Sequence, residues 1–193
     1  MTNLTTTEHF AKYGWAYVPK LVSKSECKML TDYLFLLKTE NKTKSGDYQC
    51  PLSDAIYGEK HLDLFLESIR PKISKLVDIP LLPTYSYSRI YRTDEELLCH
   101  KDRESCEISA TITLGHDEKS GIWPIYFSAK DDFTDTHRQI IEVGGAVIYR
   151  GMDLWHWRQK YKGRWQTQIF IHYVDENGSN SDFAYDKRAK LGT

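Results

Sequence analysis

The hydrophobic positions of the first eighty residues recur mostly at helical spacing. Four of them follow one another three or four positions apart: Cys27, Leu30, Leu34 and Leu37. This spacing places their side chains on one face of a helix. Ser23 and Glu26 precede them in the Ser-x-x-Glu order of a capping box. We therefore predict a helix over residues 24–38, entered from a short strand at residues 15–19.

A second helical pattern covers residues 59–77. Its apolar face is formed by Leu62, Phe65, Leu66 and Ile69. Pro71 lies within this pattern, and a proline inside a helix removes a backbone hydrogen bond. We therefore expect Pro71 to interrupt the helix or to begin a new turn.

The pattern changes after Pro80, where runs rich in Tyr, Ile, Val, Thr and Trp alternate with turn residues. These runs are Tyr85 to Tyr91, Glu107 to Leu114, Trp123 to Ser128, Gly145 to Tyr149 and Trp165 to Val174. No helical crossover separates them, so antiparallel pairing is expected. Helices followed by strands predict a β-rich α+β fold.

No linker or internal repeat divides the chain, so residues 1–193 are expected to form a single domain. Its helical part covers about residues 1–80, and its β core about residues 81–175. The polar tail at residues 176–193 is expected to be a loop.

Composition narrows the functional classes. Of 193 residues, 40% are hydrophobic and 27% charged, with a formal net charge of −1. We therefore expect neither nucleic acid nor an anionic membrane as the main partner. The N-terminal sequence MTNLTTTEHF has no basic or apolar stretch of a targeting segment, so a cytoplasmic location is expected. The four cysteines form no CxxC pair and are interpreted as free thiols.

The candidate chemistry begins with His100-Lys101-Asp102. In an extended segment, residues two positions apart face the same side, so His100 and Asp102 can reach one metal ion. His156 follows Asp102 after fifty-four positions and could complete the set. Two histidines and one carboxylate suit Fe(II) and leave coordination positions open. The alternative for an isolated His-x-Asp is a surface histidine beside a solvated aspartate.

Three segments together resemble a known family, the Fe(II)/2-oxoglutarate-dependent oxygenases, and especially their prolyl-hydroxylase-like branch. The segments are Phe10-Ala-Lys-Tyr-Gly-Trp-Ala-Tyr-Val-Pro19, Arg89-Ile-Tyr-Arg92 ahead of His100-Lys-Asp102, and the glycine-bounded run from Gly144 to His156. The resemblance implies a double-stranded β-helix, a jelly-roll or cupin-like barrel with N-terminal helices packed on one sheet. It also implies Fe(II), with 2-oxoglutarate and O2 as co-substrates.

In the resembling family, 2-oxoglutarate chelates iron through its 2-oxo acid end. The resemblance further implies that a cation and a hydroxyl group bind the carboxylate at its other end, the far carboxylate. Arg164, eight residues past His156, is the first choice, although the family spacing is more often nine to eleven. Arg158 is the reserve, and Tyr91 matches a tyrosine that binds this carboxylate in prolyl hydroxylases. For either arginine the alternative is a solvent-facing residue in a turn.

Strand parity divides the last β-run into two faces. Arg164, Gln166, Gln168, Phe170 and His172 share one face, and the opposite face is more apolar. We expect the first face to line a ligand-binding lumen, with Gln168 and His172 deep in it, although for His172 a hydrogen-bonded core residue is the favoured interpretation. Arg103 could meet an anionic substrate group near the metal, or pair with Glu104 or Glu107.

By resemblance, the reaction is hydroxylation of a small molecule or a protein side chain, with release of succinate and CO2. Two other functions fit the same residues. One is a jelly-roll module that binds a ligand or protein without catalysis. The other is a cupin-like zinc or manganese enzyme, because two histidines and an aspartate also suit zinc.

Overall fold

The structure, a computed structural model, describes residues 4–193, so Met1 to Asn3 lie outside it. The α-helices are α1 (Thr6–Tyr13), α2 (Lys24–Thr39) and α3 (Lys60–Val77), and the 3-10 helices are η1 (Glu104–Cys106), η2 (Glu118–Ser120) and η3 (Ser181–Lys187). The strands are β1 (Trp15–Val18), β2 (Lys44–Ser45), β3 (Asp54–Tyr57), β4 (Leu81–Arg92), β5 (Leu97–His100), β6 (Ile108–His116), β7 (Ile125–Ser128), β8 (His137–Gln139), β9 (Ala146–Tyr149), β10 (Trp155–Arg158) and β11 (Trp165–Asp175).

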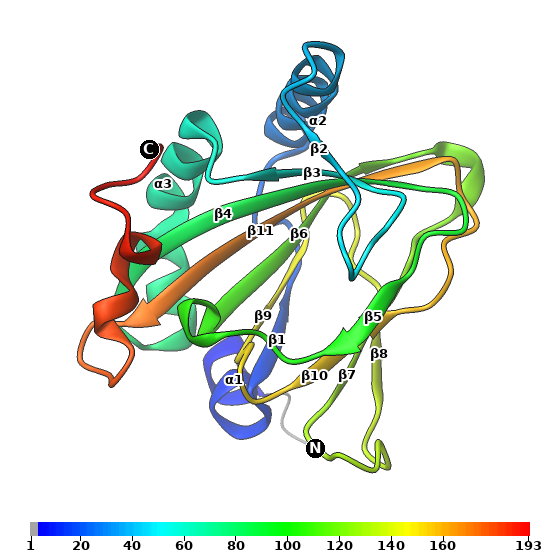
Figure 1. Cartoon of the computed structure of the whole chain (residues 1–193). Coiled ribbons are helices and arrows are strands. Elements are labelled where there is room, and N and C mark those ends of the chain that lie inside the picture. Colours follow the sequence, from blue (N-terminus) through cyan, green and yellow to red (C-terminus); the bar gives the residue numbers. More distant parts are fainter. Residues whose placement is uncertain (1–3) are drawn as a thin grey trace.

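The strands form two facing antiparallel sheets (Figure 1). The larger has seven strands in the order β1-β9-β6-β11-β4-β3-β2, and the smaller has four in the order β5-β10-β7-β8. All pairings within them are antiparallel. This is the β-rich α+β fold with a double-stranded β-helix that the sequence and its resemblance predicted.

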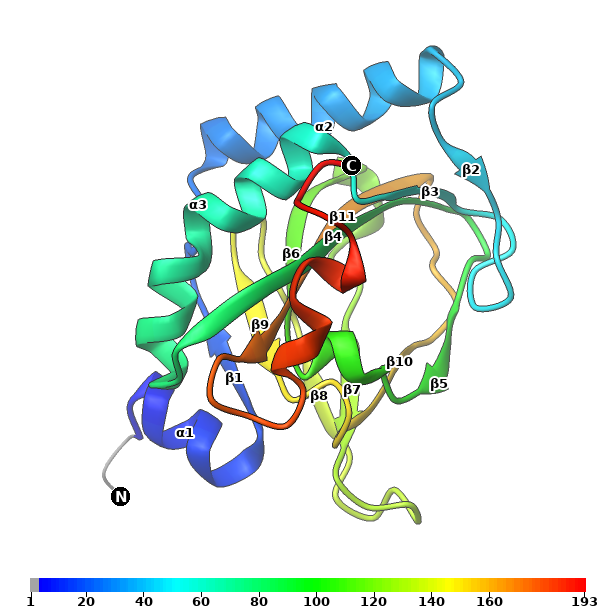
Figure 2. The ribbon, with the colours of Figure 1, turned by 60° about the vertical axis from the view of Figure 1, so that its left-hand side comes forward.

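Helices α2 and α3 cover the outer face of the larger sheet (Figure 2). The apolar face of β11, which includes Ile169 and Ile171, joins Leu34 and Leu66 in one buried cluster. Burying each such side chain contributes roughly 1.5–3 kcal/mol. The predicted packing of N-terminal helices on one sheet is confirmed.

Capping fixes where these helices begin. The side chain of Ser23 accepts from the backbone of Glu26 and the carboxylate of Glu26 accepts from that of Ser23, which completes the predicted capping box of α2. Helix α3 continues through Pro71, so the predicted interruption is wrong. Ile69 and Ile73 on either side of Pro71 are buried in the same cluster, and this packing holds both halves of the helix in place.

Each β-run expected from the sequence is present, as β4, β6, β7, β9 and β11. The short strands β2, β3, β5, β8 and β10 and the helix α1 were not predicted. The tail, expected to be a loop, contains the 3-10 helix η3. All four cysteines are free, as predicted, and Cys99 alone of them is exposed.

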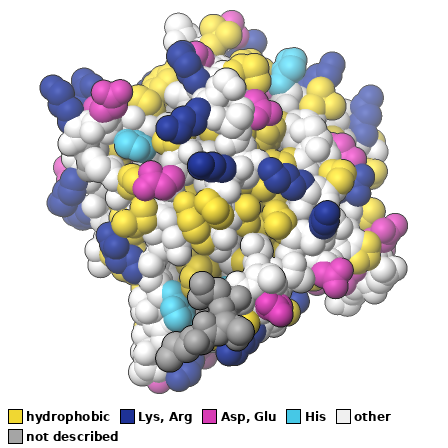
Figure 3. All heavy atoms as spheres, turned by 180° about the vertical axis from the view of Figure 1, so that it is seen from behind, with side chains coloured by type: hydrophobic (Ala, Val, Ile, Leu, Met, Phe, Trp, Pro, Cys, Tyr) yellow, Lys and Arg dark blue, Asp and Glu magenta, His cyan; other side chains and the backbone are white. Residues whose placement is uncertain are grey.

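One face of the molecule shows charged side chains of both signs. Seen from behind, lysine, arginine and acidic side chains are spread over the face with hydrophobic groups between them (Figure 3). Within residues 4–193, no helix has the length and apolar character needed to cross a bilayer.

The inner faces of the two sheets enclose the lumen. Tyr87, Arg89 and Tyr91 on β4 stand opposite Phe170, Gln168 and Gln166 on β11. A cavity of about 500 Å³ opens between the sheets, and Phe170 and His172 line it. Of the predicted inward face of β11, Phe170 and His172 line the cavity, whereas Gln166 and Gln168 are buried but are not among its lining residues.

Candidate metal centre and co-substrate pocket

Two short strands of the smaller sheet bring the candidate histidines together. His100 ends β5 and His156 lies in β10, where the two residues are direct partners in the antiparallel register. Asp102 follows β5 and is no longer in a strand. All three residues line the cavity.

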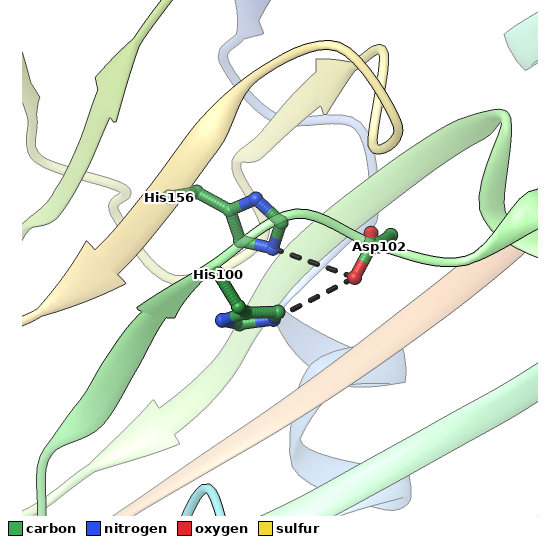
Figure 4. Close-up of side chains that lie close together, drawn as sticks. All are labelled: His100, Asp102 and His156. Carbon is green, nitrogen blue, oxygen red and sulfur yellow. Dashed lines mark ion pairs between the residues drawn. The ribbon is translucent and has the colours of Figure 1, made fainter. Parts of the chain in front are cut away.

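Their ligand atoms converge on one point (Figure 4). Nε2 of His100 lies 3.6 Å from Oδ1 of Asp102, and Nε2 of His156 lies 3.5 Å from the same oxygen. Two ligand atoms bound about 2.0–2.2 Å from one ion, roughly 90–110° apart, are separated by about 3–3.5 Å. The three side chains therefore fit a single metal ion with little movement.

The other ring nitrogens fix the tautomers of both histidines. Nδ1 of His100 donates to the carbonyl oxygen of Leu98 at 2.7 Å, and Nδ1 of His156 donates to that of Leu154 at 3.0 Å. Each Nε2 then carries a lone pair directed at the common point. Metal-binding histidines use their second nitrogen in this way.

A tight turn holds Asp102 in place. Its backbone N–H donates to the carbonyl oxygen of Gly151 at 2.9 Å, and the hydroxyl of Ser109 donates to its Oδ2 at 3.3 Å. Oδ1 remains directed toward the histidines. The carboxylate is thus held in place through Oδ2, and Oδ1 is available to bind a metal ion.

The electrostatics of the site keep Asp102 ionised. Burial alone raises the pKa of a carboxyl group, but in the absence of a metal ion the charge and hydrogen bonds that the two histidine rings offer when protonated outweigh it and lower the pKa of Asp102 far below its ordinary range. The ligand set therefore includes a permanent anion at neutral pH.

A second group of polar atoms is buried on two strands of the barrel, Arg158 on β10 and Tyr91 on β4. Arg158 and Tyr91 are fully buried and both contact the ring of Trp123. Nη1 of Arg158 donates to the carbonyl oxygen of Trp123 at 2.6 Å. Its Nε and Nη2, and the hydroxyl of Tyr91, have no hydrogen-bond partner among the described residues. Buried donors normally have partners, so these donors fit a bound carboxylate.

The structure places the other candidate arginine elsewhere. Arg164 precedes β11, and its side chain is 76% exposed, with Nε donating to the carboxylate of Asp117 at 3.1 Å. It is not part of the inward face of β11, because the strand begins only at Trp165. Arg164, the first choice for the co-substrate carboxylate, is thus exposed and bound to Asp117, whereas the reserve, Arg158, is buried with donors unpartnered among the described residues.

Several residues near the site were missed or left open by sequence reasoning. Arg103 pairs with neither Glu104 nor Glu107; its guanidinium binds Asp186 in the tail. His172 is buried beside the metal centre, where its Nδ1 is 2.8 Å from the hydroxyl of Ser109. Burial lowers the pKa of His172 to about 4, so its ring is neutral at physiological pH.

Comparison with known proteins gives matches in structure only. No protein-family model and no curated protein sequence matches the chain. A prolyl-4-hydroxylase from Pseudomonas putida superposes with a TM-score of 0.69 at 13% identity, over 88% of this chain and 97% of that one.

Two further structures agree. A Trichoplax adhaerens prolyl hydroxylase, in complex with a hypoxia inducible factor peptide, has a TM-score of 0.70 at 10% identity, over 95% and 92% of the two chains. HygX from Streptomyces hygroscopicus, with nickel and 2-oxoglutarate bound, has a TM-score of 0.62 at 12% identity, over 89% and 86%. The chain therefore has the fold of the Fe(II)/2-oxoglutarate-dependent oxygenases, as the sequence resemblance implied.

Proposed function

We propose that this protein is an Fe(II)- and 2-oxoglutarate-dependent dioxygenase that hydroxylates a small molecule or a protein side chain. The observation that carries this proposal is the presence of two polar sites in one barrel. His100, Asp102 and His156 converge in a geometry that suits metal ligands, and the unpartnered donors of Arg158 and Tyr91 are buried on strands of the same barrel.

The protein's part at the metal is to hold one face of the ion. His100 and His156 supply neutral imidazole nitrogens and Asp102 an anionic oxygen, which suits Fe(II) and leaves the opposite positions open. When bound there, iron with 2-oxoglutarate and O2 supplies the oxidising power to hydroxylate a C–H bond, releasing succinate and CO2.

Arg158 and Tyr91 have the task of binding the far carboxylate of 2-oxoglutarate. A carboxylate buried without partners carries a large desolvation cost, which a guanidinium offsets through parallel hydrogen bonds. Burial lowers the pKa of Arg158 to about 10, so it remains a cation at neutral pH. The hydroxyl of Tyr91 adds one uncharged donor.

The cavity walls determine which substrates can approach the metal. Aromatic side chains line much of it, including Tyr57, Tyr85 and Tyr149. Its volume of about 500 Å³ must hold both the co-substrate and the reacting part of the substrate. These dimensions suit a small metabolite or one side chain of a protein.

The same observations weigh against the two other functions that the sequence allows. A module that only binds a ligand has no need of metal-ligand histidines whose tautomers are fixed by Leu98 and Leu154. In a zinc or manganese enzyme without a chelating co-substrate, no bound carboxylate would pair with the buried Nε and Nη2 of Arg158.

The test is a metabolite and peptide library screened for release of succinate from 2-oxoglutarate, with protein purified without a chelating tag. The proposal predicts that succinate formation requires added Fe(II) and O2, rises with the true substrate, and is abolished in Asp102→Ala. Turnover that persists with zinc, or without 2-oxoglutarate, would instead support a cupin-like hydrolytic or isomerising enzyme.

A further inference from the structure

A carboxylate from the C-terminal tail occupies a well-formed binding position at the edge of the cavity. Asp186 accepts from Nη1 of Arg103 at 2.6 Å and from Nη2 at 2.8 Å, one donor to each of its oxygens. This is the parallel two-bond geometry by which a guanidinium recognises a carboxylate.

Two hydroxyl groups complete the position. Ser105 donates to Asp186 at 2.6 Å, and the phenol of Tyr57 donates to its second oxygen. We call Arg103, Ser105 and Tyr57 the carboxylate cradle. The cradle offers four donors to one anion, and it holds the pKa of Asp186 well below its ordinary range despite partial burial.

The cradle belongs to the wall of the substrate cavity. Arg103 and Tyr57 line that cavity together with the metal-ligand residues, and Arg103 directly follows Asp102 in the chain. The guanidinium of Arg103 lies 4.7 Å from the ring centre of Tyr85, whose ring is 4.6 Å from that of His172. A carboxylate bound by Arg103 would therefore lie beside an aromatic wall that leads to the metal.

The segment that brings Asp186 to the cradle is held mainly by polar contacts. No residue of η3 is buried. Tyr185, Asp186 and Lys187 all have positive φ angles, of 55°, 56° and 59°, a conformation that is unfavourable for residues other than glycine. The ion pairs of Asp186 with Arg103 and of Arg188 with Asp63 anchor the segment to the barrel. A competing carboxylate can make the same hydrogen bonds to Arg103 that Asp186 makes.

The charge of the cavity also favours an anionic substrate. The cations among its lining residues are Arg89, Lys101 and Arg103, against the anions Asp47 and Asp102. Arg89 is engaged by Asp47 at 2.6 Å and Asp102 is committed to the metal site. Once Asp186 leaves, the guanidinium of Arg103 has lost its carboxylate partner and favours an anionic ligand.

We propose that the carboxylate cradle is a substrate subsite, and that Asp186 occupies it only until a carboxylic acid substrate displaces it. The claim that the carboxylic acid bound by the cradle is the substrate rests on the proposed oxygenase function. The claim that the cradle binds a carboxylic acid does not. Arg103 then positions the carboxylate, and the tail residue Asp186 acts as an internal competitor that makes the cavity selective for anions able to replace it.

The experiment compares benzoate with benzamide, which have the same shape and differ in charge. Binding is measured by calorimetry under nitrogen with Fe(II) and saturating 2-oxoglutarate, so that Arg158 is already occupied. Asp186→Asn removes the competing charge and should raise benzoate affinity by about ten- to a hundred-fold, the factor of one charge-assisted hydrogen bond. Asp182→Asn, an exposed change in the same tail, should leave it unchanged.

Variants of the cradle itself keep the proposal testable if Asp186→Asn fails to fold. Arg103→Gln should abolish preferential binding of benzoate over benzamide, and Tyr57→Phe combined with Ser105→Ala should weaken benzoate several-fold. The proposal is overturned if benzoate affinity is the same in the wild type, Arg103→Gln and Asp186→Asn.

A separate readout distinguishes failure of this inference from failure of the proposed function. If 2-oxoglutarate binds the iron-loaded protein but the affinity for benzoate does not depend on the cradle residues, the subsite is refuted and the oxygenase function stands. If 2-oxoglutarate does not bind at all, the proposed function is refuted. The benzoate titration is then repeated without 2-oxoglutarate in Arg158→Ala, and it still decides whether the cradle binds a carboxylate.

Discussion

Gly151 and Asp102 lie so close together that no other residue fits at position 151 without movement. A Cβ atom placed on Gly151 would lie 2.4 Å from Oδ2 of Asp102 and 2.4 Å from the carbonyl oxygen of Cys106. The turn before β10 therefore sets the position of the candidate carboxylate ligand, although Gly151 itself has no side chain to offer.

We predict that Gly151→Ala weakens metal binding by about ten- to a hundred-fold, the range found when a group supporting a metal ligand is altered. The added methyl group pushes the Asp102 carboxylate away from the point where the histidines converge. The measurement is a titration of the metal-free protein with Fe(II) under nitrogen.

Gly178→Ala is the control, because Gly178 lies in the tail and a Cβ there meets only Asp175. Equal iron affinity in the wild type and both variants would mean that Asp102 is not a ligand, or that its turn moves freely.

The second prediction concerns the co-substrate pocket. Arg158→Ala removes the buried guanidinium and should raise the dissociation constant for 2-oxoglutarate by about ten- to a hundred-fold, as expected for a lost charge-assisted hydrogen bond. Tyr91→Phe should have a smaller effect in the same direction. Iron affinity should change little in either variant.

Arg164→Ala is the matched control, since its guanidinium is exposed and bound to Asp117. A larger effect from Arg164 than from Arg158 would restore the original choice from the sequence. No effect from either arginine would place the far carboxylate elsewhere on the lumen face.

The sequence predicted those parts of the site that depend on local periodicity. The spacing of His100 and Asp102 in an extended segment was enough to put both on one side, and the glycine-bounded run identified His156 as their partner. The alternation along β11 also correctly predicted that Phe170 and His172 face the cavity.

The sequence analysis preferred Arg164 to Arg158 because β10 was not recognised as a strand. His156 and Arg158 are two positions apart and face the same side, a signal that the sequence did contain. The pairing of Arg103 with Asp186 had no such signal. It joins residues eighty-three positions apart through a tail without periodicity, so only the folded chain brings them together.

The third prediction concerns pH. His172 has a folded pKa of about 4, below the ordinary value of 6.5, because burial disfavours its charged form. The unfolded chain therefore binds a proton on this residue between pH 6.5 and 4 that the folded chain does not. The free energy of unfolding of the metal-free protein should fall across that window as pH decreases, by up to about 3 kcal/mol from this residue.

Urea unfolding at pH 7.5 and pH 5 measures this contribution, with His172→Gln as the comparison. The variant has no proton to take up at this position, so its stability should depend less on pH over the same interval. An identical pH dependence in both proteins would show that His172 is not held neutral by burial.

The central claim is that one lumen holds a metal and a chelating co-substrate together. Calorimetric titration of 2-oxoglutarate under nitrogen, into Fe(II)-loaded and metal-free protein, tests it most directly. The account predicts equimolar iron, 2-oxoglutarate binding at least ten-fold tighter with iron than without it, and loss of this difference in Asp102→Ala. Iron that does not bind, or 2-oxoglutarate that binds equally well without metal, would contradict it.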